Sequence, residues 1–84
     1  MAKVTLYTTP YCPFCLRAKA LLRSKDVAFE EIDVSDADKR DEISERTNWP
    51  TVPQIFIGDE FIGGYDELQA LDDDGELSAK LAAA

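Results

Sequence analysis

Two cysteines, Cys12 and Cys15, stand three residues apart where a predicted strand gives way to a predicted helix. The residues before them, 4–7, are apolar or β-branched and predict a buried strand. The residues after them, 16–25, are rich in Ala and Leu and predict a helix with Pro13 in its first turn. Cys12 is then the N-cap, where free backbone N–H groups and the helix dipole stabilise an anion. We therefore expect Cys12 to be held as a thiolate and to act as a nucleophile.

Cys15 follows Cys12 by one helical turn, which is close enough for a short disulfide between them. A C-x-x-C beside a strand–helix–strand pattern favours thiol–disulfide chemistry. Two other interpretations remain open. A closed zinc site would have to form between two chains, because the sequence contains two Cys and no His. Two buried structural thiols are the other interpretation, although a Pro between them at a helix start suits the redox arrangement better.

Composition narrows the class of protein. The 84 residues suffice for one domain with a core of marginal size. No apolar run approaches the length of a membrane span and the N-terminus lacks a signal-peptide pattern, so we expect a soluble, cytoplasmic protein without a membrane partner. The net charge of −8 argues against a nucleic-acid partner. An anionic substrate would need a locally positive cradle of helix N-termini, backbone N–H groups and a few Lys or Arg.

The next part of the chain predicts a second strand and a second helix. The strand covers residues 27–34 and should run parallel to the first strand, because a right-handed helical crossover connects them. The helix covers residues 36–46, and its few apolar residues place it at the periphery. Ser35 is its expected N-cap, and Asp38 would complete a capping box.

The remaining residues predict a hairpin and a further helix. A strand over residues 51–57 is joined by a two-residue turn to a strand over 60–62. A third helix is expected over residues 65–71, because the acidic residues that follow oppose a helix C-terminus. Residues 76–81 predict one last short helical turn.

The expected organisation is a single domain over residues 1–79. The remaining residues, 80–84, read Lys-Leu-Ala-Ala-Ala and are similar to a translated expression-vector tail, so we assign them no function. We find no internal repeat and no low-complexity linker that would divide the domain.

Three motifs in this order resemble the glutaredoxin family. Cys-Pro-Phe-Cys at residues 12–15 follows the first strand, Thr-Val-Pro at 51–53 opens the third, and Gly-Gly-Tyr-Asp at 63–66 precedes the third helix. The match spans essentially the whole chain and is most similar to the small dithiol class of bacterial glutaredoxins. The resemblance implies an α/β, thioredoxin-like fold. Its four-stranded mixed sheet would have the order 2-1-3-4 and be flanked by three helices plus the short C-terminal helical turn.

The resemblance also implies a glutathione site beside the catalytic pair, Cys12 and Cys15. The backbone of Val52 would pair with the tripeptide, and the following Pro53 would be cis. The γ-glutamyl end would bind at the start of the third helix, where a helix N-terminus favours a carboxylate. The expected glutathione-binding residues are Tyr11, Phe14, Thr51, Val52, Pro53, Gly64, Tyr65 and Asp66.

The implied activity is glutathione-dependent thiol–disulfide exchange by a monomer without a metal cofactor. Glutathione is the co-substrate, and the other partners are disulfide-bonded or glutathionylated client proteins. Cys12 would attack a mixed disulfide, and Cys15 would resolve the intermediate formed with a protein disulfide. The alternatives left open are a [2Fe–2S] cluster-binding glutaredoxin, a glutathione-independent thioredoxin-like reductase, and a structural or interaction module.

The chain departs from the family pattern at three points. Thr9 stands where glutaredoxins generally carry a Lys, so the helix terminus must contribute more to holding the thiolate. Phe14 replaces the usual Tyr and lacks its hydroxyl group. Residues 48–51, Asn-Trp-Pro-Thr, resemble the monothiol class, which typically carries C-G-F-S and binds a [2Fe–2S] cluster. Because Pro13 and Cys15 are both present, we favour dithiol redox chemistry over cluster carriage.

Overall fold

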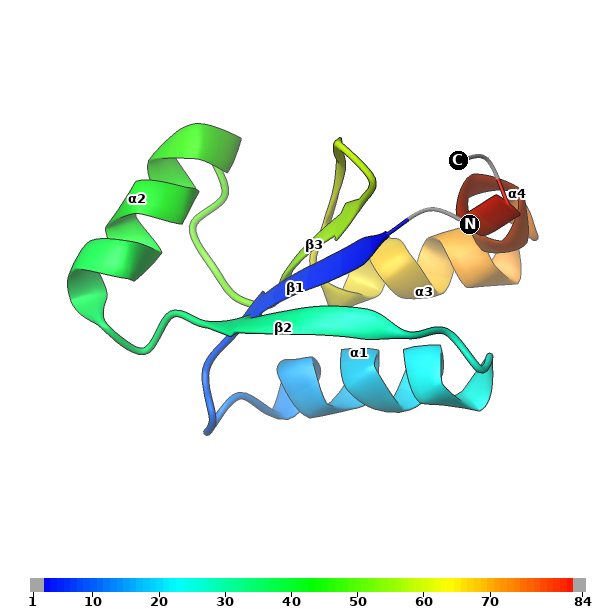
Figure 1. The fold of residues 1–84 in the computed structure, drawn as a ribbon, viewed down its shortest axis with the longest axis horizontal. Helices are drawn as coiled ribbons and strands as arrows, with labels where there is room; N and C mark the ends of the chain where they lie inside the picture. Colours follow the sequence, from blue (N-terminus) through cyan, green and yellow to red (C-terminus); the bar gives the residue numbers. More distant parts are fainter. Residues whose placement is uncertain (1–2, 83–84) are drawn as a thin grey trace.

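A computed structural model describes residues 3–82 of the chain. The elements, in chain order, are β1 (Val4–Thr8), α1 (Pro13–Ser24), β2 (Phe29–Asp33), α2 (Ala37–Thr47), β3 (Gln54–Ile57), β4 (Glu60–Gly63), α3 (Tyr65–Asp73) and α4 (Glu76–Ala82). The sheet order is β2-β1-β3-β4, with β1 parallel to β2 and antiparallel to β3, and β4 antiparallel to β3 (Figure 1). The expected mixed sheet and thioredoxin-like fold are confirmed.

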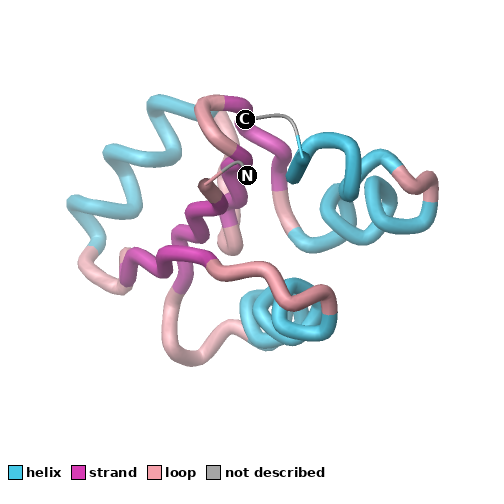
Figure 2. Tube along the Cα trace, turned by 45° about the vertical axis from the view of Figure 1, so that its right-hand side comes forward, coloured by secondary structure: helices cyan, strands magenta, loops and turns pink. Residues whose placement is uncertain are grey.

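The core lies on one face of this sheet. Side chains alternate along β1, so Val4, Leu6 and Thr8 are buried on the face that α1 and α3 cover. From α1, Ala18 and Leu22 pack into this layer. The other core residues are Ile55, Ile57, Leu68 and Leu77. α2 stands apart from α1 and α3 in both views (Figures 1 and 2) and buries Ile43 alone, which agrees with its expected peripheral position.

The start of α2 differs from the expectation. Its N-cap is Asp36, whose Oδ1 accepts a hydrogen bond from the Asp38 N–H at 3.1 Å, and not Ser35. The Ser35 N–H instead donates to the carboxylate of Asp33 at 2.7 Å, which closes a turn directly after β2. Ser and Asp are both good N-cap residues, so only local contacts of this kind decide which of two neighbouring candidates caps the helix.

The C-terminal helices are longer than expected. α3 continues to Asp73, since Lys25 Nζ lies 2.6 Å from the carboxylate of Asp72 and offsets its charge near the helix end. Residues 76–82 form the helix α4 and not a single turn, because Leu77 is fully buried in the core. No helix among residues 3–82 is long and apolar enough to cross a membrane.

The strands at the hairpin also differ from their expected bounds. β3 begins at Gln54 and not at residue 51, because Pro53 lacks the N–H that a strand ladder requires.

Residues 80–82 belong to α4, and Lys80 Nζ lies 2.8 Å from a carboxylate oxygen of Glu60. The vector origin of residues 80–84 stays a prediction, as does the domain limit at residue 79, and residues 1–2 and 83–84 lie outside the described part.

Candidate active site

Cys12 is the N-cap of α1, as the position of Pro13 predicts. Its backbone is extended, with φ −97° and ψ 113°, so the chain enters the helix at this residue. Its Sγ accepts a hydrogen bond from the backbone N–H of Cys15 at 3.2 Å. Cys12 as a residue is partly exposed to solvent. An anion on Cys12 would therefore meet both a direct N–H donor and the positive end of the helix dipole.

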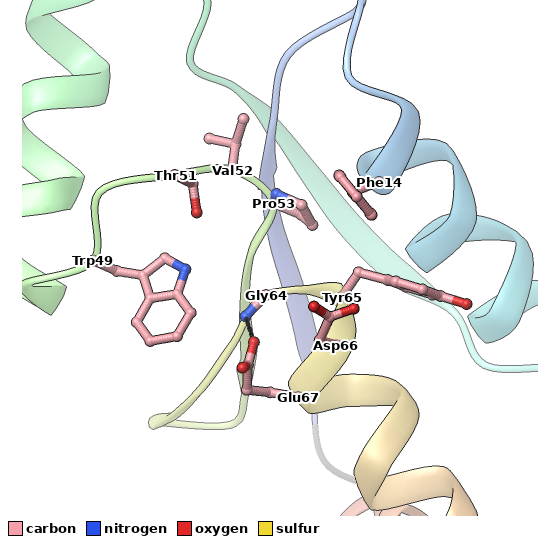
Figure 3. Close-up of a pocket in the computed structure, with 9 residues that line it drawn as sticks. All are labelled: Phe14, Trp49, Thr51, Val52, Pro53, Gly64, Tyr65, Asp66 and Glu67. Carbon is pink, nitrogen blue, oxygen red and sulfur yellow. Dashed lines mark hydrogen bonds between the residues drawn. The ribbon is translucent and has the colours of Figure 1, made fainter.

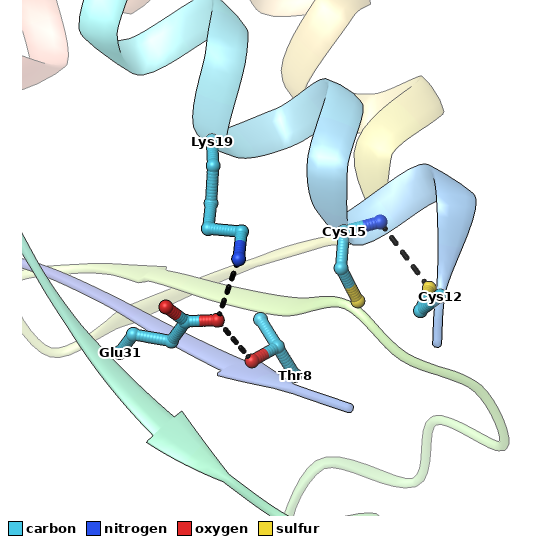
Figure 4. Close-up of polar contacts among 5 residues, drawn as sticks. All are labelled: Thr8, Cys12, Cys15, Lys19 and Glu31. Carbon is cyan, nitrogen blue, oxygen red and sulfur yellow. Dashed lines mark hydrogen bonds and ion pairs between the residues drawn. The ribbon is translucent and has the colours of Figure 1, made fainter. Parts of the chain in front are cut away.

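Cys15 has the opposite environment. It is 1% exposed, and its side chain points from α1 toward the strands (Figure 4). Burial raises the pKa of the Cys15 thiol to about 12, a hydrogen bond to Cys12 adds to the effect, and the Thr9 N–H opposes it. Cys15 thus remains a neutral thiol near pH 7, which leaves Cys12 as the accessible sulfur of the pair.

The loop before β3 forms the wall opposite Cys12. The Val52–Pro53 peptide bond is cis, as the family resemblance implies. Cys12 Sγ lies 3.6 Å from the carbonyl oxygen of Val52, to which its thiol donates. The loop and the N-terminus of α1 are therefore in direct contact at the sulfur.

A buried amide side chain anchors this loop. Gln54 is fully buried, and its Nε2 donates to the carbonyl of Trp49 at 3.0 Å. Its Oε1 accepts from the hydroxyl group of Thr47 at 2.6 Å, at the end of α2. These bonds satisfy both ends of the amide and connect the loop to α2, so Gln54 restrains the backbone that faces Cys12.

A groove of about 290 Å³ runs along this wall (Figure 3). The residues that line it come from α1, the loop and α3: Phe14, Trp49, Thr51, Val52, Pro53, Gly64, Tyr65, Asp66 and Glu67. The structure therefore brings together seven of the eight residues predicted to bind glutathione. The eighth, Tyr11, is not part of the lining and is 71% exposed.

The start of α3 closes the lower end of the groove. The N–H of Gly64 donates to Glu67 Oε1 at 2.9 Å, which satisfies one of the free donors of the helix end (Figure 3). Gly63 has φ 120°, and a Cβ there would lie 2.8 Å from Glu67 Cγ, so a side chain cannot be accommodated. The Gly64 N–H already donates to Glu67. Gly64 therefore contributes to the groove through the close approach of its backbone to the neighbouring residues.

Charge is unevenly distributed around the groove. Asp66 and Glu67 are the charged residues of its lining. Arg17 lies over the Phe14 ring, 5.2 Å from its centroid, and brings a positive charge to the rim. Two lining residues, Trp49 and Glu67, were not in the predicted set. The position of Trp49 two residues before Thr51 and that of Glu67 in a capping box are the sequence signals that could have identified them.

An accessible sulfur paired with a buried thiol can exchange a disulfide with a substrate. On this sheet, the pair defines a thiol–disulfide oxidoreductase of the thioredoxin-like fold. Residues 4–62 match the family model described as "Glutaredoxin". The chain belongs to the glutaredoxin family.

Individual relatives match nearly the whole of this chain. The chain is 51% identical to Glutaredoxin 3 of Escherichia coli K12 over 82 residues, which cover 96% of this chain and 99% of that protein. A solution structure of glutaredoxin from Brucella melitensis shares 50% identity with a TM-score of 0.86, covering 96% of this chain and 89% of that one. A crystal structure described as a buckwheat glutaredoxin–glutathione complex shares 30% identity with a TM-score of 0.88, covering 95% and 76% respectively.

Proposed function

We propose that the protein is a glutathione-dependent thioltransferase that reduces protein disulfides and glutathione mixed disulfides. The observation that carries this proposal is the contact between Cys12 Sγ and the Val52 carbonyl, which joins the reactive sulfur to the groove. The solved complex of the buckwheat relative with glutathione supports the same ligand here.

In the proposed complex, the backbone of glutathione pairs with the backbone of Val52 at the groove wall. Its γ-glutamyl carboxylate lies at the start of α3, by Tyr65, where the helix dipole favours negative charge. Its ammonium group meets Asp66, and Thr51 lines the groove from the loop that carries Val52. The Phe14 and Tyr65 rings, whose centroids are 6.3 Å apart, bound the groove on the α1 side.

The reaction begins when the Cys12 thiolate attacks the glutathione sulfur of a mixed disulfide. The client leaves as a thiolate, takes up a proton, and Cys12 carries the glutathione. The thiolate of a second glutathione then attacks this adduct, which releases oxidised glutathione and regenerates Cys12. With a protein disulfide, Cys15 attacks the intermediate instead, which yields the reduced client and a Cys12–Cys15 disulfide.

The test is a mixed-disulfide reduction assay, coupled in separate arms to glutathione reductase with glutathione and to thioredoxin reductase without it. We expect turnover in the glutathione arm alone. Turnover in the thioredoxin reductase arm alone would favour the glutathione-independent reductase. Visible absorbance from a bridged dimer, with silent thiols, would favour cluster binding.

A matched pair of variants tests where glutathione binds. Asp66→Asn removes the carboxylate at the start of α3, so we expect the KM for glutathione to rise several-fold. Asp59→Asn makes the same change of net charge in the turn between β3 and β4 and should leave the KM unchanged. Equal effects would show that the general field of the protein, and not the groove, attracts glutathione.

We also propose that the protein works as a monomer in the cytoplasm, where glutathione maintains a reducing poise. Size-exclusion chromatography of the reduced protein tests the monomer, and fractionation of cells tests the compartment.

A further inference from the structure

A polar cluster lies beside Cys15, on the core side of α1, and is separate from the groove. Glu31 Oε2 accepts a hydrogen bond from the Thr8 hydroxyl group at 2.6 Å. The same oxygen lies 3.0 Å from Lys19 Nζ. Figure 4 shows Lys19 and Cys15 extending from α1 toward the strands, with Glu31 and Thr8 facing Lys19.

The fold brings these residues together for simple reasons. Thr8 is the last buried residue of β1 and faces α1, as Val4 and Leu6 do. Leu6 pairs with Glu31 in the parallel register, so Glu31 points to the same face of the sheet. Lys19 follows Cys15 by four residues, which places both side chains on one side of the helix.

The ammonium group of Lys19 is held in place and is only weakly screened by solvent. Its side chain is 16% exposed, and Glu31 fixes its ammonium group. The hydrogen bond from Thr8, followed by that from Lys19, lowers the pKa of Glu31, with a smaller contribution from Arg23. Glu31 thus stays ionised and keeps Lys19 paired at neutral pH.

Few charges act on the Cys15 sulfur. Burial has the largest effect on the pKa of Cys15 and raises it, Cys12 raises it further through a hydrogen bond and through its charge, and the charge of Lys19 lowers it. The acidic residues at the start of α3, Asp66 and Glu67, line the groove instead. When Cys12 is bound in a mixed disulfide it carries no charge, so its coulombic effect on Cys15 disappears while that of Lys19 remains.

We propose that Lys19, held by Glu31 and Thr8, is a positioning residue that speeds the attack of Cys15 on the Cys12 mixed disulfide. In this step the Cys15 thiol loses its proton to solvent, and its sulfur forms the bond to Cys12. The Cys12–substrate bond breaks, and the substrate leaves as a thiolate that takes up a proton. The substrate is reduced and the cysteine pair is oxidised. This inference rests on the proposed role of Cys15 as the resolving thiol.

The experiment mixes reduced protein with excess oxidised glutathione. Acid quenching and mass spectrometry then separate the Cys12–glutathione adduct from the Cys12–Cys15 disulfide. Lys19→Gln should leave adduct formation unchanged and slow its resolution. If the Cys15 pKa rises by one unit, the thiolate is tenfold scarcer but more nucleophilic, so resolution slows about threefold near neutral pH. Lys19→Arg keeps the charge and should retain most of the rate.

Lys3→Gln is the matched control. Lys3 Nζ lies 2.8 Å from Glu30, the neighbour of Glu31 on the opposite face of β2, so this variant removes the same charge and breaks a more exposed ion pair away from Cys15. We expect it to resolve the adduct at the wild-type rate. An equal slowing by Lys3→Gln, or an Arg variant as slow as Lys19→Gln, would overturn the proposal.

Rescue by the charge-keeping variant separates an electrostatic role from a structural one, because Lys19→Arg also changes the side chain but keeps a positive charge beside Glu31. No deficit of Lys19→Gln near neutral pH contradicts the inference. Failure of the wild-type protein to form or resolve the adduct would instead contradict the proposed function.

Discussion

The backbone N–H of Cys15 points at the sulfur of Cys12 across 3.2 Å. The donor belongs to the main chain of α1, so it does not depend on the side chain at position 15. The Cys15 thiol, by contrast, is buried and stays protonated near neutral pH. The two cysteines therefore differ in role, although they are one helical turn apart. Cys12 is placed to attack the substrate, and Cys15 is placed to attack the mixed disulfide that results.

Single substitutions of the two cysteines should separate these roles. Cys12→Ser should abolish all disulfide reduction, because no accessible sulfur remains. Cys15→Ser keeps the N–H donor to Cys12, so it should retain glutathione-dependent removal of glutathione from client proteins and lose the reduction of protein disulfides. Initial rates on a glutathionylated peptide and on a protein disulfide measure the two activities. Complete loss of both activities in Cys15→Ser would contradict this division.

The buried thiol should also make the reduced protein sensitive to alkali. The pKa of Cys15 is raised from 9.0 to about 12 by burial, and then by Cys12. Between these values the unfolded chain releases the proton that the folded protein retains, so the free energy of unfolding falls as the pH rises. Denaturant unfolding at several pH values, with a non-thiol reductant, measures the slope. In Cys15→Ala this part of the slope should vanish, and an identical slope would refute the prediction.

The local features of the active site could be predicted from the sequence, whereas the contacts between distant segments could not. The N-cap role of Cys12 follows from Pro13 and the helical pattern after it, since both signals lie within one turn. The order of the sheet and the cis peptide bond before Pro53 came from the family resemblance. No local pattern marks Gln54 as the anchor of the loop or Thr8 as a partner of Glu31, because these contacts form only when separate elements pack.

Removal of the Gln54 amide should loosen the loop. Gln54→Ala leaves the Trp49 carbonyl without its donor and opens a cavity, so we expect a loss of about 1–3 kcal/mol in the free energy of unfolding. It should also raise the KM for glutathione, since the Val52 backbone is no longer restrained. Ser78→Ala, a truncation at an exposed position of α4, is the control and should change neither quantity appreciably. An unchanged KM in Gln54→Ala would show that the loop holds its position without the amide.

A Lys at position 9 should increase the thiolate population of Cys12. Thr9 is buried just before the active-site turn, but the long stem of a Lys can bring its ammonium group to the surface near the sulfur. The added positive charge favours the thiolate. Ultraviolet thiolate absorbance should therefore appear at lower pH in Thr9→Lys than in wild type. Thr9→Gln, of similar length and no charge, should titrate as wild type, and a coincident curve for Thr9→Lys would reject the prediction.

The buried indole N–H of Trp49 lowers the free energy of unfolding, and replacing Trp49 by Phe would remove this group. Its Nε1 is buried and finds no hydrogen-bond partner among the described residues, while its ring makes an edge contact with Phe61 at 5.6 Å. An unpaired buried donor costs about 1–3 kcal/mol. Trp49→Phe keeps an aromatic contact and removes the donor, so we expect the free energy of unfolding to stay within about 1 kcal/mol of wild type. Trp49→Ala loses the ring as well and should cost about 3 kcal/mol. Equal losses in the two variants, measured by denaturant unfolding, would show that the N–H is paired in solution.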